Sequence, residues 1–260
     1  MKSKSKKRYS VLVIVLFFAL WEFITRLNIV NTMLLPPLSE VLLSVEGLAV
    51  GGNLPVHISL SLGRAMAGLS IAVLTAIPAG ILMGGLSRRF QLALEPVAEF
   101  FSQLNPFVLY HLILIFMGIG EAAKIAIIAW ACIWPLLFST IAGVCNIDGM
   151  YIKCAKAFRL NRLQMAFKII IPAAVPQIMY GIRMSAGYSL FMLIAAEMMG
   201  GESGLGFLIV FSQKFYQIRN VYALVIIIAL LGVLLDTALN FIEKKLLGRY
   251  YQEEYNVGIS

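Results

Sequence analysis

The sequence predicts an all-α, polytopic membrane protein, from its composition, its long apolar segments and the placement of its charges. Of the 260 residues, 60% are hydrophobic and only 13% are charged, whereas charged residues make up about 25% of a typical soluble domain. Several apolar segments reach the roughly 20 residues that a helix needs to cross a bilayer. This composition excludes a soluble globular protein, and we expect a single membrane domain over residues 1–260 with about six transmembrane helices.

The basic residues indicate the orientation of the chain in the membrane. The net charge of +8 raises nucleic-acid binding as an alternative, but the basic residues gather at the ends of apolar segments and do not form a face with interleaved aromatic residues. If both termini are cytoplasmic, most of the 21 Lys and Arg residues lie on the cytoplasmic side, as in other membrane proteins. We therefore expect the lipid bilayer, and no nucleic acid, as a partner, with residues 1–8 and 247–260 in the cytoplasm.

The first apolar segment, from Tyr9 to about Leu27, follows a basic stretch and has two interpretations. A cleaved signal peptide is one. The segment is too long for the apolar part of a signal, continues through Trp21, and has no cleavage site flanked by small residues. An uncleaved first span is therefore preferred. The next stretch, to His57, is rich in turn residues and too broken to span.

Five further spans are expected, at about Leu60–Leu86, Leu94–Met117, Ala123–Val144, Ala173–Met199 and Val221–Leu239. Polar side chains inside a span need partners or water, so the following residues are candidates for a pathway through the membrane: Gln103, Asn105, Tyr110, His111 and Glu197. The alternative for the first four is hydrogen bonding between helices. Glu197 lies near the outer end of its span, where it can meet a solute, a partner helix or interfacial water.

Residues 148–172 interrupt the apolar pattern between the fourth and fifth spans. This stretch carries five basic residues between Lys153 and Lys168 and no acidic ones, so we place it in the cytoplasm. Apolar residues recur at three- and four-residue spacing on both sides of Arg159-Leu160-Asn161, which predicts two short helices joined by a turn. The residues alone favour equally a docking element for a soluble partner and a helix pair lying on anionic lipid.

The stretch Ala155–Arg162, together with Phe167 and Ile171-Pro172, resembles the EAA loop of bacterial ABC importer permeases, the binding-protein-dependent transport family. Further segments resemble the branch of this family that imports nitrate, sulfonates, taurine and related small solutes: Leu35–Val41, Ser59–Arg64, Gly118–Glu121, Ala196–Met198 and Gly204–Gly206. The resemblance extends from about Leu35 to Leu246. Each motif is weak by itself, and their order and spacing together are specific.

The resemblance implies a membrane subunit of an ATP-driven importer in the bacterial cytoplasmic (inner) membrane. It would form the pathway for a small organic or anionic solute, such as nitrate, a sulfonate, taurine or a vitamin precursor. The implied partners are an ATPase subunit dimer, a second permease subunit, most simply a second copy of this chain, and an extracytoplasmic binding protein. The residues implied to couple the permease to the ATPase are Ala155, Phe158, Arg159, Asn161, Arg162, Leu163 and Phe167.

No enzymatic activity is expected of this chain. It contains no GxxxxGK[ST] phosphate-binding loop, so ATP and Mg²⁺ are expected on the partner ATPase, and no cofactor or metal on the permease itself. The three cysteines have no paired spacing that would indicate disulfides or a metal site. An intramembrane enzyme is disfavoured because the only histidines are His57 and His111 and there is no HExxH or GxSxG motif.

An ion-coupled secondary transporter of a small solute is the alternative function. Asp236, in the sixth span, could serve a proton relay in such a protein, although a basic or backbone partner would also account for it. Secondary transporters often contain inverted repeats with broken helices, and the two halves of this chain show no clear internal repeat.

The stretch 148–172 departs from the family pattern at the turn. Arg159 holds the position where the family usually has Gly, and Lys153-Cys154-Ala155 replaces the usual Glu-Ala-Ala opening. If the turn requires a positive φ, Arg carries a steric cost that Gly does not. Asn161 tolerates the left-handed region better and is the alternative residue to make the turn.

Overall fold

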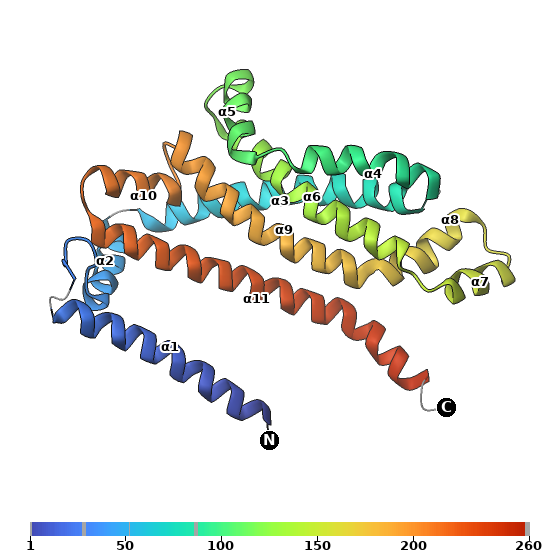
Figure 1. The fold of residues 1–260 in the computed structure, drawn as a ribbon, viewed down its shortest axis with the longest axis horizontal. Helices are drawn as coiled ribbons and strands as arrows, with labels where there is room; N and C mark the ends of the chain where they lie inside the picture. The colour runs from blue at the N-terminus through green and yellow to red at the C-terminus, as the bar shows by residue number, and fades with distance from the viewer. Residues whose placement is uncertain (1, 28–29, 52, 86–87, 258–260) are drawn as a thin grey trace. The chain divides into compact units, whose positions relative to one another are not determined.

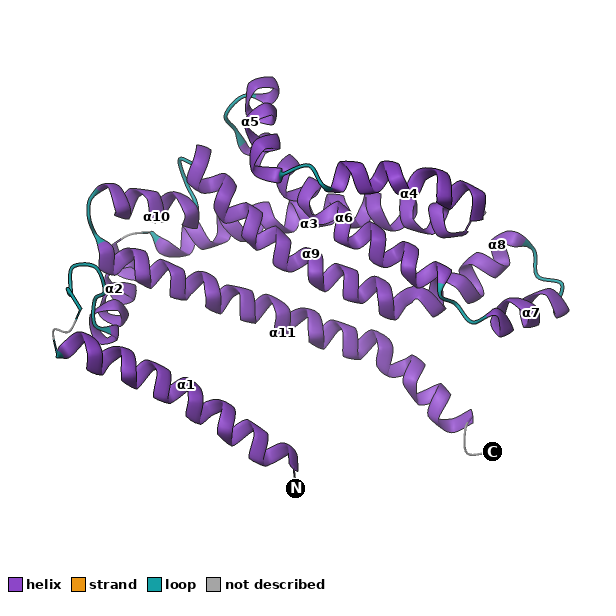
Figure 2. Ribbon diagram, viewed as in Figure 1, coloured by secondary structure: helices purple, strands orange, loops and turns teal. Residues whose placement is uncertain are grey.

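The computed structural model describes residues 2–27, 30–51, 53–85 and 88–257, and every regular element in this part of the chain is helical, which confirms the all-α class (Figures 1 and 2). The helices are α1 Lys2–Arg26, α2 Leu38–Gly51, α3 Leu54–Gly85, α4 Arg88–Ser102, α5 Pro106–Met117, α6 Glu121–Cys145, α7 Gly149–Ala157, α8 Arg162–Met165, the π-helix η1 Ala166–Ile170, α9 Ile171–Gly200, α10 Leu205–Lys214 and α11 Ile218–Val257.

Four helical segments in the described residues are long and apolar enough to cross a membrane: Leu54–Gly85, Glu121–Cys145, Ala166–Gly200 and Ile218–Lys245. They correspond to the expected second, fourth, fifth and sixth spans. The expected first span falls within α1, where the side chains of several residues lie outside the described set. The total of six spans therefore stays a prediction.

The expected third span is not one continuous helix. Helices α4 and α5 meet at an angle of 82°, with the break at Gln103, Leu104 and Asn105. Pro106 explains the break, because proline disfavours a helical conformation at the preceding residue and suits the first position of a new helix. Asn105 caps that helix by accepting a 2.9 Å hydrogen bond from the Phe107 amide.

Helices α2 and α10 lie where the sequence predicted no helix. Helix α10 has 10 residues, and α2 has 14. Both are shorter than a membrane span, so neither produces the long apolar signal on which the span assignments depended. The segments around α2 and α10, which are rich in proline or glycine, were therefore interpreted only as breaks between spans.

The chain divides into two compact units, one formed by Met1–Leu60 with Glu202–Leu230 and the other by Ser61–Gly201 with Leu231–Ser260. In the first unit, Trp21 donates a 3.1 Å hydrogen bond to the Pro36 carbonyl, and His57 Nδ1 accepts one of 2.9 Å from the Gly204 amide. These contacts link α1 to the segment before α2, and α3 to the segment before α10.

The core of the second unit is formed mainly by α3, α6 and α9. Its buried residues include Ala72, Ile128 and Leu193. The helices approach closely at small residues, as is common in membranes. Helices α6 and α9 are also joined by Ser185, whose hydroxyl donates a 2.8 Å bond to the Cys132 carbonyl.

Gly80 provides a test of this packing. A Cβ atom there would lie 2.6 Å from the Thr140 Cβ of α6, whereas a Cβ at Gly63, also inside α3, would meet nothing within 4 Å. We expect Gly80→Ala to be less stable than Gly63→Ala by about 1–3 kcal/mol, the usual cost of overpacking. Both positions lie in the interior of the helix and gain the same intrinsic helix propensity, so SDS-titrated unfolding in mixed micelles isolates the clash. Equal midpoints for the two variants would contradict this packing.

Candidate functional site

A cluster of charged side chains joins α3, α6 and α9 in the second unit. Arg64 of α3 lies 2.6 Å from Glu197 of α9 through Nη1 and 2.5 Å from Glu121 of α6 through Nε. Lys124 of α6 lies 3.0 Å from Glu121. Ser61 donates hydrogen bonds of 2.8 and 3.0 Å to the two Glu197 oxygens. We call these five residues the ionic cluster.

Most of the ionic cluster is excluded from solvent. Arg64 and Lys124 are each 4% exposed and Glu197 is 1% exposed, while the Glu121 side chain is 58% exposed. Two positive and two negative charges balance within the cluster, and the guanidinium fork engages two carboxylates at once. A buried charge requires such pairing, because removal of one partner leaves the other without compensation. The cluster therefore fixes where α3, α6 and α9 meet.

The sequence analysis placed only Glu197 among the site residues. Of the expectations for it, the structure supports the partner helix, because the carboxylate is buried against Arg64 and does not reach water. Arg64, Glu121 and Lys124 were missed. A signal was present: Arg64 near the start of one span, Glu121 at the start of another and Glu197 near the end of a third all map to the same expected membrane side. The sequence did not show which way each of these side chains faces around its helix axis, and therefore did not show that they meet.

The predicted pathway residues divide into separate environments. Tyr110 is 1% exposed and its hydroxyl donates a 3.2 Å hydrogen bond to the Ala196 carbonyl of α9, so it joins helices. His111 is exposed, with Nδ1 2.9 Å from the carbonyl of Phe107 in the preceding turn. Gln103 and Asn105 lie exposed at the break between α4 and α5. The structure thus does not gather these residues into one polar site.

The break between α4 and α5 borders a cavity of about 420 Å³. We call it the break cavity. Its wall is formed by the break itself, by α6 and by α9. The lining residues are Ser102, Leu104, Asn105, Pro106, Phe107, Ala131, Trp134, Pro135, Phe138, Tyr188, Phe191 and Met192. Of the predicted pathway residues, Asn105 is the one that contributes to this wall.

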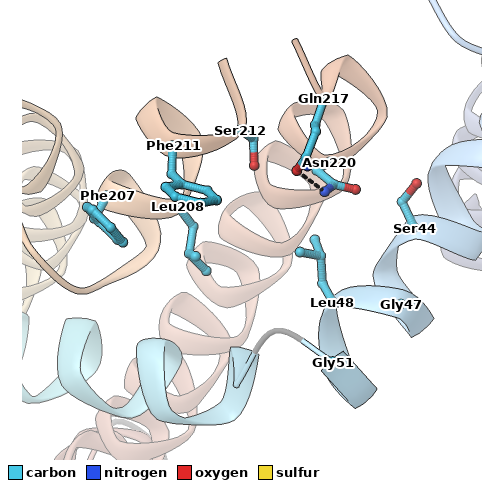
Figure 3. A pocket seen from close by; sticks show the side chains of 10 residues that line it. All are labelled: Ser44, Gly47, Leu48, Gly51, Phe207, Leu208, Phe211, Ser212, Gln217 and Asn220. Carbon is cyan, nitrogen blue, oxygen red and sulfur yellow. Dashed lines mark hydrogen bonds between the residues drawn. The ribbon is translucent and has the colours of Figure 1, made fainter. Parts of the chain in front are cut away.

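The first unit has a hollow of its own, of about 450 Å³, between α2, α10 and the start of α11. Figure 3 shows Phe207, Leu208 and Phe211 of α10 on one side of it and Leu48 of α2 on another. Asn220 donates a 2.9 Å hydrogen bond to Gln217 at its edge. None of the residues predicted from the sequence to line a pathway or contact an ATPase lines this hollow.

The stretch between α6 and α9 has the predicted two-helix form, with α7 and α8 on either side of a turn and η1 leading into α9. Arg159 adopts φ 52°, so the turn does require the left-handed conformation. The alternative that Asn161 makes the turn is wrong. Asn161 instead caps α8: its Oδ1 accepts 2.7 Å from the Gln164 amide, and the Gln164 side chain accepts 3.1 Å from the Asn161 amide, the reciprocal pattern of a capping box.

Two aromatic side chains of this stretch are open to solvent. Phe158, directly before the turn, is 80% exposed, and Phe167, in η1, is 68% exposed. The side chains of the predicted coupling residues Ala155, Arg162 and Leu163 lie outside the described residues. Each of the two phenylalanines therefore offers an apolar side chain, close in sequence to basic residues, that a partner could cover.

The candidate proton-relay residue Asp236 has a basic partner. Arg183 of α9 lies 3.7 Å from Asp236 and also forms an ion pair with Glu243; both acidic residues are on α11. This geometry gives Asp236 a structural ion pair.

Among the residues that the structure describes, no group of three or more His, Cys, Asp or Glu side chains is placed to hold a metal ion.

The family of this chain follows from comparison with known proteins. Residues 76–248 match the family described as binding-protein-dependent transport system inner membrane component. The putative aliphatic sulfonates transport permease protein SsuC of Bacillus subtilis (strain 168) is 31% identical, over 95% of this chain and 90% of its own. The taurine transport system permease protein TauC of Escherichia coli (strain K12) is 31% identical, over 91% of this chain and 88% of its own.

A solved structure, of the inward-facing MetNI methionine ABC transporter, shares the fold with a TM-score of 0.62 at 16% identity, over 74% of this chain and 95% of that one. This chain belongs to the binding-protein-dependent transport system inner membrane component family. It is a permease subunit of an ABC importer.

The ionic cluster predicts that replacing a buried carboxylate costs much more stability than replacing an exposed one. Glu197→Gln should destabilise the protein by about 3–5 kcal/mol, because Arg64 stays buried with less compensating charge. Glu40→Gln is the control: Glu40 pairs with Arg219 at 2.8 Å, with the side chains 41% and 65% exposed, so a loss under about 1 kcal/mol is expected. SDS-titrated unfolding measures both. If the two variants unfold alike, the buried pair does not hold these helices.

The turn at Arg159 makes a second prediction. Arg159→Gly should retain stability or raise it by up to about 1 kcal/mol, because Gly adopts a positive φ without a Cβ clash. Arg159→Val should loosen the turn, because a β-branched residue fits a positive φ poorly. The rate of chymotrypsin cleavage after Phe158 reports the local effect and should rise only for Val. Faster cleavage of the Gly variant than of the Val variant would contradict the turn geometry.

Proposed function

We propose that this permease forms the pathway for a small organic or anionic solute and that a separate ATPase drives it through residues 149–170. An extracytoplasmic binding protein delivers the solute, and two copies of this chain pair in the cytoplasmic membrane with their termini in the cytoplasm. ATP and Mg²⁺ bind the ATPase. The names of the relatives, which refer to aliphatic sulfonates and taurine, support a small solute of this kind.

The observation that carries the proposal is the exposed aromatic pair Phe158 and Phe167 on a short helical stretch rich in Lys and Arg. A helical element that inserts apolar side chains into a groove is a recurrent way for helices to bind partners. A helix pair lying on lipid would also use such residues. The family of the chain favours a protein partner, because a binding-protein-dependent importer needs an energy source and this sequence has no phosphate-binding loop.

Helix α9 connects the proposed docking surface to the ionic cluster. It begins directly after η1 and has 30 residues, a length of about 45 Å at 1.5 Å per residue. Glu197 lies near its far end and is fixed to Arg64. A displacement of the loop is therefore transmitted along one continuous helix to the opposite end of the bundle, where the helix is tied to α3. Such movement of packed elements is a known route of transporter switching.

The test is whether an ATPase is retained when the docking surface is changed. Phe158→Asp and Phe167→Asp should each reduce by about tenfold or more the ATP hydrolysis that copurifies with the tagged permease, because a charge replaces an aromatic anchor, and anchor residues contribute at least about 2 kcal/mol to binding. Tyr216→Asp is the matched control: Tyr216 is 87% exposed and lies between α10 and α11, on the expected opposite side of the membrane.

Size-exclusion chromatography of all three variants shows that the permease itself is intact. Unchanged ATPase recovery with both phenylalanine variants would refute the proposed docking surface. Loss of the ATPase in the Tyr216 variant alone would place the motor on the other side of the membrane.

A further inference from the structure

We propose that the break cavity binds the ring of a neutral or amine-bearing heteroaromatic solute, a class narrower than the small organic or anionic solute proposed above. The inference rests on that proposed function, because it treats the cavity as part of the solute pathway. The cavity volume of about 420 Å³ lies within the range of roughly 300–1,000 Å³ typical of small-molecule sites.

The position of the cavity argues against lipid as its occupant. At Gln103, Leu104 and Asn105 the chain leaves the helical conformation, and the side chains of Gln103 and Asn105 are exposed there. In a bilayer, non-helical backbone and exposed polar side chains occur only where protein or a water-filled cavity faces them. In secondary transporters, broken helices next to such cavities commonly bind the solute, and we infer that the break between α4 and α5 has the same use in this permease.

The wall of the cavity suits a flat ring. Phe107 and Phe191 meet edge to face, with ring centroids 5.8 Å apart and planes at 89°. Trp134, Phe138 and Tyr188 also line the cavity. Aromatic side chains favour a further ring in stacked or edge-to-face contact by about 0.5–1.5 kcal/mol beyond its burial. These contacts would be lost on a small aliphatic solute.

The polar groups of the cavity are few and uncharged. The side-chain oxygen Oδ1 of Asn105 accepts from the Phe107 amide at 2.9 Å, so the group with which this lining residue would donate to a ring nitrogen or carbonyl oxygen is its side-chain NH₂. Ser102 and Tyr188 supply hydroxyl groups. A small number of placed polar groups in an otherwise apolar wall is the usual composition of a selective site.

The described wall of the break cavity lacks the positive charge expected of a site for sulfonates or nitrate. All its described lining residues are uncharged. A neighbouring hollow of about 500 Å³ shares Ser102 and Phe138 with it and adds the carboxylate of Glu99. An anion would be desolvated here without a cationic partner, beside a negative charge, whereas an amine on a ring would be attracted. The wall therefore favours a neutral or amine-bearing ring over an anion.

Equilibrium dialysis of the full-length permease in lipid nanodiscs tests the inference, with 4-aminoquinoline as the probe and empty nanodiscs as the measure of membrane partitioning. We expect saturable retention by the permease, with no competition from excess taurine or nitrate. Phe191→Leu, which keeps an apolar side chain but removes the ring, should weaken retention about 2- to 10-fold. Phe116→Leu is the matched control, because Phe116 is 86% exposed and lies on α5 away from the cavity wall.

Three results would overturn the inference: no retention above empty nanodiscs, equal retention by the Phe191→Leu and Phe116→Leu variants, or displacement of the probe by taurine or nitrate. If no probe is retained and Phe191→Leu changes the oligomeric state, a second copy of the chain fills the cavity, which also overturns the inference. Recovery of the ATPase with the wild-type permease is assayed in parallel. If the ATPase is recovered but the probe is not retained, the ring site alone is refuted. If the probe is retained but no ATPase is recovered, the proposed function is refuted.

Discussion

The guanidinium group of Arg64 joins three helices of the second unit. It is 4% exposed and sits among the ends of three helices, so its charge must be balanced by protein groups that are themselves fixed. Glu197 meets it on one side and Glu121 on the other. Because the N–H groups of a guanidinium donate to carboxylates only in fixed directions, the cluster constrains both the depth and the rotation of the helices that supply those carboxylates.

The break between α4 and α5 is a second constraint in the same unit. Helix α4 ends at Ser102 and α5 begins at Pro106, at 82° to it, which leaves polar groups between them that lipid cannot satisfy. The cavity beside them is walled by α6 and α9, two helices that also contribute to the ionic cluster. A movement of α9 would therefore affect both features, and this connection offers a physical route by which the partner proposed to dock at residues 149–170 would change the shape of the break cavity.

The sequence was sufficient to predict features that depend on local patterns. Segment length and hydropathy predicted the helices now seen as α3, α6, α9 and α11, and residue spacing predicted the two short helices around Arg159. The positive φ at Arg159 was one of two alternatives left open by the family pattern, in which glycine usually occupies that position; the other was a turn made at Asn161. The bend at Asn105-Pro106 had a local signal that was outweighed by the continuous apolar run on both sides.

The features that escaped prediction depend on contacts between distant residues. The pairing of Arg64 with Glu197 joins positions 133 residues apart, and no periodicity in one helix determines the rotation of another. Tyr110 and Glu197 were both assigned to a pathway because each is polar within an apolar segment, yet each is buried in helix contacts. Polarity within a span predicts that a partner exists and does not predict whether that partner is a solute or a helix.

Uptake by reconstituted proteoliposomes tests the central claim, that this permease transports only when a separate ATPase moves it. The account predicts accumulation of solute against its gradient when the permease, the ATPase, the binding protein and ATP with Mg²⁺ are all present, and none when the ATPase is omitted. Uphill accumulation by the permease alone, driven by a proton or sodium gradient, would contradict it.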